Sequence, residues 1–138
     1  MNDNDPRGSR SAKHCYHQYR IKRICKKKGF VVKIEKYVPD VASYVDISVK
    51  IKGKSNNIYL LGIEIALSPR HESVNIAKDL EAGYHYIIVA AENESISAIK
   101  KIIAALNRED KRKVFCCKLQ NIEEYLTDMF ADKEVDEK

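Results

Sequence analysis

The sequence has no apolar run near the roughly 20 residues that a membrane-spanning helix needs. Its polar start, MNDNDPRGSR, also lacks the apolar segment of a signal peptide. We therefore expect an intracellular, cytoplasmic protein with no membrane partner. A glycine-rich phosphate-binding loop is absent too, which excludes a P-loop nucleotide enzyme.

Cysteine is scarce and badly spaced for zinc. The four cysteines form no CxxC pair, and the adjacent Cys116 and Cys117 offer no familiar zinc geometry. We interpret all four as thiols in a reducing compartment.

Length and composition indicate one domain. The chain has 138 residues, 44% of them hydrophobic, which is enough to bury a core. We predict a disordered segment over residues 1–10, a domain over residues 11–130 and a charged tail over residues 131–138. The formal net charge of +5 suits a polyanionic partner and leaves nucleic acid open.

Hydrophobic periodicity, with glycine and proline as breakers, predicts alternating helices and strands. Strands joined by short turns pair antiparallel, whereas strands joined through a helix are usually parallel. The expected fold class is therefore α/β, with a mixed sheet flanked by helices. Helices are expected over residues 11–28, 71–82, 93–106 and 121–130, strands over 30–37, 45–52, 58–66, 84–91 and 114–119, and a loop over 107–113.

The chain is organised around the hairpin segment from residue 44 to residue 68. Apolar and polar residues alternate over 45–52, which places Asp46 on the polar face of a half-buried strand. The second strand is almost wholly apolar and is interrupted by Glu64. If Lys52 pairs with Ile58 across the turn, the register places Asp46 directly opposite Glu64.

Two carboxylates in a cross-strand pair repel each other unless a cation, a proton or a lysine compensates. A hard divalent ion is one solution, with Glu35 and Glu72 as auxiliary ligands. Lys50 shares the polar face of Asp46, but four residues of strand place it about 13 Å away. A buried glutamate paired with a lysine is the structural alternative for Glu64.

The first predicted helix is strongly basic in its second half. These cations suit the negative end of the helix dipole and could also follow a phosphate backbone, and both interpretations stay open. His14 and His17 are interpreted as surface residues. The candidate nucleic-acid contacts on this helix are Arg20, Lys22, Arg23, Lys26 and Lys27.

In the second predicted helix, Ser73, Ile76, Ala77 and Leu80 are expected to form the inner stripe. The opposite side would then carry His71, Asn75 and Lys78. For Lys78, a solvated lysine and a functional one are both open interpretations.

With this element order, the two carboxylates resemble the core of the PD-(D/E)XK nuclease superfamily over roughly residues 11–117. The resemblance implies a restriction-endonuclease-like αβββαβ core with a C-terminal αβα extension. In that family an Asp and a Glu on neighbouring strands bind a divalent metal, and a Lys follows two residues after the Glu. Asp46 and Glu64 match the first two positions, but Ala66 stands at the third.

The segments GIEIALS and NIAKDLEAGYHYIIVAAE are also similar to small domains of this superfamily attached to conjugation and mobile-element ATPases. That resemblance implies roles for Asn75 in DNA binding and for Lys78 as a migrated catalytic lysine. It also implies Mg²⁺ or Mn²⁺ held by Asp46, Glu64 and the backbone carbonyl of Ile65. DNA is the implied partner, with a homodimer or an association with such an ATPase as further expectations.

Three hypotheses follow for function. The first is a metal-dependent DNA nuclease with Asp46, Glu64 and Lys78 in its site. The second is a catalytically inactive module of the same fold that binds nucleic acid or protein, which Ala66 favours. The third is a structural domain detached from a larger ATPase or mobile-element protein.

Overall fold

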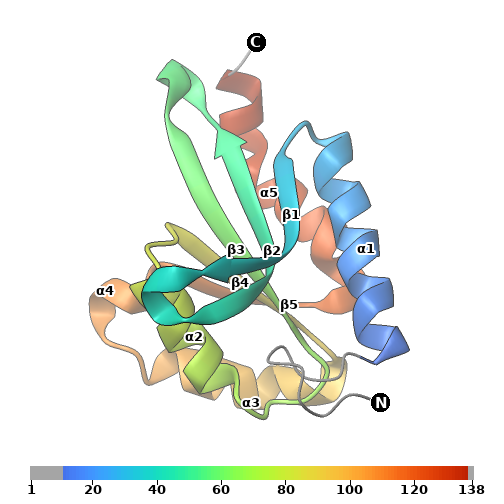
Figure 1. Ribbon diagram of the computed structural model, residues 1–138, viewed down its shortest axis with the longest axis vertical. Helices are drawn as coiled ribbons and strands as arrows, with labels where there is room; N and C mark the ends of the chain where they lie inside the picture. Colours follow the sequence, from blue (N-terminus) through green and yellow to red (C-terminus); the bar gives the residue numbers. More distant parts are fainter. Residues whose placement is uncertain (1–10, 137–138) are drawn as a thin grey trace.

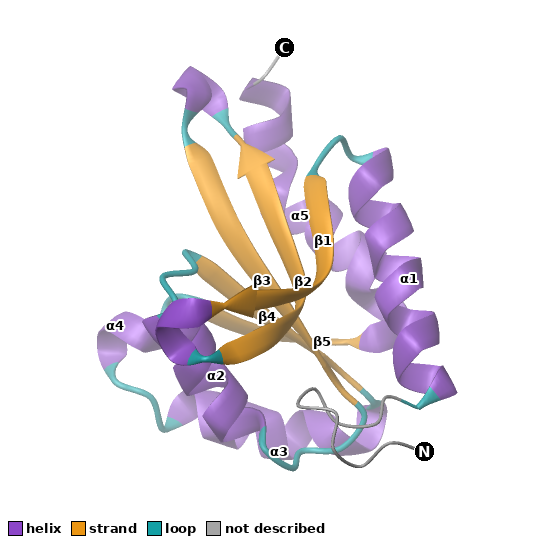
Figure 2. Cartoon of the chain, in the orientation of Figure 1, coloured by secondary structure: helices purple, strands orange, loops and turns teal. Residues whose placement is uncertain are grey.

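A five-stranded mixed sheet runs through the molecule, and helices cover both of its faces (Figures 1 and 2). The computed structural model describes residues 11–136. The elements follow one another as α1 (Ala12–Lys27), β1 (Val31–Val38), β2 (Ser43–Lys52), β3 (Ile58–Ala66), α2 (Glu72–Glu81), β4 (Tyr86–Ala91), α3 (Asn93–Ala104), α4 (Arg108–Lys111), β5 (Val114–Lys118) and α5 (Ile122–Asp136).

The strands lie in the order β1-β2-β3-β4-β5, which is also their order in the chain. The pairs β1–β2 and β2–β3 are antiparallel, whereas β3–β4 and β4–β5 are parallel and joined through helices. The predicted α/β class and mixed sheet are therefore confirmed. None of the helices within residues 11–136 combines the length and the apolar character needed to cross a membrane.

Each face of the sheet has its own hydrophobic core. Helices α1 and α5 cover one face, where Ile21 and Leu126 pack with strand residues such as Ile63. Helices α2 and α3 cover the other face, where Ile76 and Ile99 pack on Val89. The residues that alternate along β3 and β4 thus divide between two buried clusters, which explains why both strands are so apolar.

Local capping residues set several helix ends. The side chain of Ser11 accepts a hydrogen bond from the backbone of His14 and caps α1. Gly29 and Gly83, with φ of +84° and +94°, follow α1 and α2 as the sequence predicts.

Two predicted boundaries are wrong. The segment predicted as a loop over residues 107–113 contains the short helix α4, because the Asn107 side chain accepts from the backbone N–H of Asp110 at 2.8 Å and caps it. Helix α5 continues through a distorted residue, Phe130, to Asp136 and so includes most of the predicted tail. The predicted segment 1–10 lies outside the described residues.

The predicted hairpin register is confirmed. The paired residues of β2 and β3 run from Lys52–Ile58 to Ile47–Ile63, and Asp46 and Glu64 lie directly beyond the last of these pairs. The predicted alternation breaks at this point, because Val45 packs in the core under α2 while Ile47 packs in the core under α1. On the neighbouring strand β1, Glu35 has a φ of 57° beside Asp46, which marks the same local distortion.

Helix α2 is rotated relative to the prediction. Ser73 and Ala77, predicted to face inward, are exposed, and the buried residues are Glu72, Ile76 and Asp79. The physical reason is that the helix has few large apolar side chains, and its acidic residues turn toward the sheet instead. Asn75 and Lys78, predicted to lie on the outer side, are partly buried beside the start of β2.

Candidate functional site

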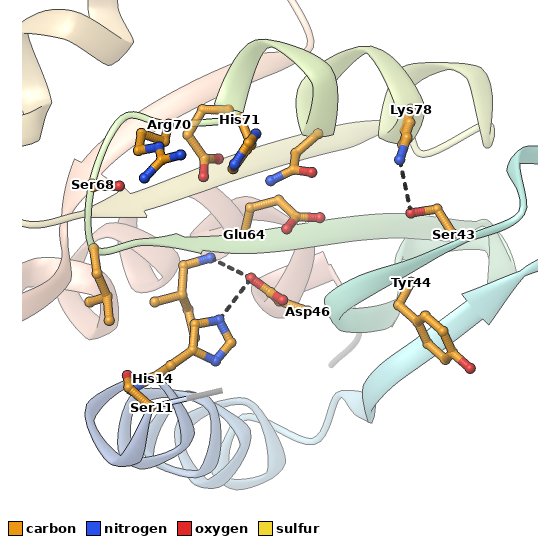
Figure 3. Close-up of a pocket in the computed structure, with 14 residues that line it drawn as sticks. Ser11, His14, Ser43, Tyr44, Asp46, Glu64, Ser68, Arg70, His71 and Lys78 are labelled. Carbon is orange, nitrogen blue, oxygen red and sulfur yellow. Dashed lines mark hydrogen bonds and ion pairs between the residues drawn. The ribbon is translucent and has the colours of Figure 1, made fainter. Parts of the chain in front are cut away.

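A cavity of about 420 Å³ lies between the start of α1, the start of β2, the end of β3, and α2 (Figure 3). It forms where the register of β2 and β3 ends, so polar side chains rather than strand pairing occupy this edge of the sheet. Its lining residues are Ser11, His14, Ser43, Tyr44, Asp46, Glu64, Ile65, Leu67, Ser68, Arg70, His71, Glu72, Asn75 and Lys78.

Asp46 is held in a fixed orientation. Its Oδ2 accepts a hydrogen bond from the backbone N–H of Ile65 at 2.9 Å and lies 3.3 Å from Nε2 of His14. The amide of Gln18 donates to the Asp46 backbone carbonyl at 3.2 Å. Helix α1 and strand β3 thus position this carboxylate together, and little of it is exposed.

Glu64 lies deeper than Asp46 and next to a third carboxyl group. Burial, followed by the negative charges of Asp46 and Asp79, raises the pKa of Glu64 well above its usual range. A hydrogen bond between Glu64 and Asp79 raises the pKa of Glu64 further and lowers that of Asp79. The proton of this pair therefore resides on Glu64 when no cation is present.

Glu72 and Asp79 complete an acidic cluster with Asp46 and Glu64. Burial and the charge of Asp46 raise the pKa of Glu72 to about 8, and burial is the main cause that raises the pKa of Asp79 to about 6. Within the described part of the chain, Oε1 of Glu72 and Oδ2 of Asp79 are buried without a hydrogen-bond partner. Such a concentration of buried acceptors favours protons or a cation.

Two basic side chains stand at opposite ends of the cavity. Figure 3 shows Arg70 at one end and Lys78 at the other, with Glu64 and Asp46 between them. Nζ of Lys78 lies 3.5 Å from Oγ of Ser43. Ala66 is buried in the core under α2 and α3, whereas Lys78 lines the cavity from α2.

The donor atoms fit a hard divalent ion. Within the described residues, no three or more His, Cys, Asp or Glu side chains form a group that could hold a metal by themselves. Mg²⁺ is usually held by one or two carboxylates together with water and phosphate oxygens, and Asp46 and Glu64 supply two such carboxylates. The carbonyl of Ile65 points to the same edge of β3 as its N–H, which bonds to Asp46, and could add a third oxygen.

The other candidate residues are divided between this site and the rest of the surface. Asn75 lines the cavity, and Glu72 belongs to the acidic cluster. Glu35 lies outside the cavity lining, where its Oε2 accepts from Gln18 at 2.6 Å, and Lys50 is exposed further along β2.

The predicted DNA contacts of α1 do not line the cavity. Lys26 lies roughly 18 Å along the helix axis from His14. Arg23, Lys26 and Lys27 are exposed, whereas Arg20 donates to the backbone carbonyl of Leu119 at 2.6 Å and so links α1 to the end of β5.

His14, Gln18 and Asp79 belong to the site and were missed or misplaced from the sequence. His14 was interpreted as a surface residue, yet it is only 6% exposed. Spacing contained a usable signal, because His14, Gln18, Ile21 and Cys25 follow the intervals of one helix face and form the buried face of α1. The burial of Asp79 could not be predicted, because nothing in the sequence indicated that α2 turns this residue toward the sheet.

Comparisons with protein-family models, curated proteins and solved structures find no match to this chain. The functional argument therefore rests on the geometry and chemistry of the cavity. That geometry places buried carboxylates, flanking cations and one oriented imidazole around a single open space.

In a chelating buffer, the free energy of unfolding is expected to fall as the pH rises from about 5 to about 8. Folded Glu72 keeps its proton up to a pKa of about 8, while the unfolded chain releases it near 4.5, so stability present at low pH is lost across this window. The slope is about 1.4 kcal/mol per pH unit for each such proton. Urea unfolding at several pH values measures it.

The variant Glu72→Gln keeps the side-chain shape and removes this titration, so its slope should be shallower. Glu81→Gln, on the exposed side of the same helix, is the matched control and should keep the wild-type slope. Equal slopes for wild type and Glu72→Gln would show that Glu72 does not hold the proton.

Proposed function

We propose that this chain is a divalent-metal-dependent, nuclease-like domain that acts on DNA by phosphodiester hydrolysis. The observation that carries the proposal is the buried pair Asp46 and Glu64, which lie directly beyond the last pair of the β2–β3 ladder and line a cavity that Lys78 also lines. The order α1-β1-β2-β3-α2-β4, with β3 and β4 parallel, supports a restriction-endonuclease-like core.

In this proposal Asp46, Glu64 and the carbonyl of Ile65 hold Mg²⁺ or Mn²⁺. When bound, the ion supplies Lewis-acid activation of water and offsets charge on the phosphate. The Ile65 N–H and His14 contact the same oxygen of Asp46, which fixes the orientation of the carboxylate that would hold the ion. Because the pKa of Glu64 is raised, its proton would have to leave for the carboxylate to hold the ion, so ion binding is expected to become stronger as the pH rises.

Lys78 is assigned the role that the motif lysine would otherwise have. Its ammonium group lines the cavity from α2 and can stabilise negative charge that develops on the phosphate. Arg70, at the opposite end, can hold a neighbouring phosphate of the same strand. Asn75, which lines the cavity from α2, is assigned a hydrogen bond to DNA.

The basic residues of α1 extend the proposed DNA surface beyond the cavity. Because they lie up to roughly 18 Å along the helix from His14, they contact DNA away from the scissile bond. The homodimer and the association with a mobile-element or conjugation ATPase stay predictions.

Cleavage assays test the proposal directly. Plasmid, branched and single-stranded DNA are incubated with the protein in Mg²⁺ or Mn²⁺, and wild type is expected to cut at least one of them. Glu64→Gln should reduce the rate by about 100-fold or more, because it removes a charged ligand. Glu81→Gln is the control and should cut normally; no cleavage by wild type, or equal cleavage by Glu64→Gln, contradicts the proposal.

The alternative is a catalytically inactive module of the same fold that binds DNA or a protein. The specific observation in its favour is Ala66, which is buried in an apolar core where the motif has a lysine. Under this alternative, salt-dependent DNA binding should persist in chelator and in Asp46→Ala. Loss of DNA binding on adding chelator would exclude it.

A further inference from the structure

Helix α1 has two chemically distinct faces. The buried face carries His14, Gln18, Ile21 and Cys25 against the sheet. The opposite side presents two tyrosines that are among the most exposed large side chains of the described residues, at 59% for Tyr16 and 54% for Tyr19. We define the outer face of α1 as Tyr16, Tyr19, Lys22, Arg23, Lys26 and Lys27. Positions 16, 19, 23 and 26 are three or four residues apart, so their side chains lie on the same side of the helix.

The outer face is positively charged without compensation from its own helix. The segment from Ala12 to Lys27 contains no aspartate or glutamate. Two other cations of α1 are engaged elsewhere, because Lys13 pairs with Glu92 and Arg20 donates to the Leu119 carbonyl. Lys22, by contrast, places its ammonium group 5.8 Å from the ring centre of Tyr19, so cation and aromatic ring share one surface.

Exposed tyrosines between lysines and arginines are the combination that binds unpaired nucleic acid. Bases of a single strand stack on aromatic rings while the backbone follows the cations. In a duplex the bases are stacked inside the helix, so only its phosphates can contact this surface, through the lysines and arginines. The two rings are therefore the feature that distinguishes single-stranded from double-stranded DNA at this surface.

We propose that the outer face of α1 binds single-stranded DNA, with bases stacked on Tyr16 and Tyr19 and phosphates on Arg23, Lys26 and Lys27. The choice of DNA as ligand rests on the proposed nuclease function, whereas the preference for an unpaired strand rests on α1 alone. The outer face and the cavity lie on opposite sides of α1, about 10 Å apart. The substrate class is thus DNA with an unpaired segment beside the strand that is cut.

Fluorescence anisotropy in EDTA measures this binding without cleavage. Wild type should bind a 20-nucleotide oligo(dT) more tightly than a 20-base-pair duplex. The double variant Tyr16→Leu/Tyr19→Leu should bind oligo(dT) at least about 10-fold more weakly, while its duplex affinity changes less than about 2-fold. The variant Tyr16→Phe/Tyr19→Phe keeps both rings and should restore binding.

The charges give a second, independent readout. Arg23→Gln/Lys26→Gln/Lys27→Gln should lower the salt dependence of oligo(dT) binding by about 2 in the log–log slope, because each phosphate contact on a single strand contributes about 0.7. Lys100→Gln/Lys101→Gln, an exposed pair on α3, is the matched control and should leave the slope unchanged.

Certain outcomes overturn the inference. One is an unchanged affinity of Tyr16→Leu/Tyr19→Leu for oligo(dT), and another is an equal loss of its affinity for oligo(dT) and for the duplex. A third is that Tyr16→Phe/Tyr19→Phe fails to restore binding. The failure of the nuclease proposal would look different, because Glu64→Gln should bind oligo(dT) like wild type in EDTA. A variant that loses cleavage but still binds oligo(dT), or one that loses oligo(dT) binding but still cleaves, therefore separates the nuclease proposal from the single-strand binding proposal.

Discussion

Mg²⁺ or Mn²⁺ is expected to raise the unfolding temperature of the wild-type protein by several degrees. The unfolding temperature of Glu64→Gln should not change when the ion is added. Binding to the folded state alone adds about 2.7 kcal/mol at a free ion concentration about 100 times Kd. An ion bound by the acidic cluster would replace protons there and would offset the charge of the buried carboxyl groups, whose pKa values are raised in its absence. Thermal unfolding followed by circular dichroism, with and without the ion, measures the effect.

The substitution is suited to this comparison because Glu64 is protonated in the ion-free protein. Glutamine has nearly the shape of the protonated acid, so Glu64→Gln should unfold in EDTA at a temperature close to that of wild type. Asp46→Asn should lose the ion effect as well, while Glu81→Gln should keep it. A shift of the same size in wild type and Glu64→Gln would place the ion elsewhere.

Lys78→Met is expected to reduce the cleavage rate by about 100-fold while the stabilisation by Mg²⁺ stays intact. An ammonium group aimed at the phosphate acts in the transition state, and removal of one such donor typically lowers kcat by about 100-fold to 1000-fold. Methionine fills the space of the lysine stem, so packing of α2 is preserved. Single-turnover cleavage, paired with the thermal shift, separates catalysis from ion binding.

Lys78→Arg keeps the charge and should recover part of the rate, which a purely structural role would not require. Lys100→Met, which removes an exposed lysine of α3 outside the cavity, is the control and should cleave DNA at the wild-type rate. Cleavage by Lys78→Met at the wild-type rate would return Lys78 to the solvated interpretation and leave the site without its proposed lysine.

The hairpin was predictable because its information is local. The turn after Lys52 and the apolar run from Ile58 set the pairing, and that pairing is observed from Lys52–Ile58 to Ile47–Ile63. The carboxylate pair and the mixed sheet followed from the same pattern of strands and helices. The break in alternation at Asp46 did not, because it depends on the distorted Glu35 of a neighbouring strand and on hydrogen bonds from α1.

Helix α2 shows what a hydrophobic pattern misses at a polar site. Counting small and apolar residues placed Ser73 and Ala77 inward, but the buried side of the helix carries Glu72 and Asp79 instead. A helix face whose buried residues are acidic shows no apolar stripe in the sequence, so hydrophobic periodicity does not identify it. His14 is a different case, because its spacing with Gln18, Ile21 and Cys25 indicated the buried face of α1, whereas its contact with Asp46 could not be predicted from the sequence.

Anomalous diffraction from a crystal soaked in Mn²⁺ tests the central claim most directly. We expect one anomalous peak between the carboxylates of Asp46 and Glu64, within about 2.5 Å of an oxygen of each. The peak should be absent from crystals of Glu64→Gln soaked in the same way. Strong Mn²⁺ peaks elsewhere, with none between these two side chains, would contradict the assignment of this cavity as a metal-dependent site.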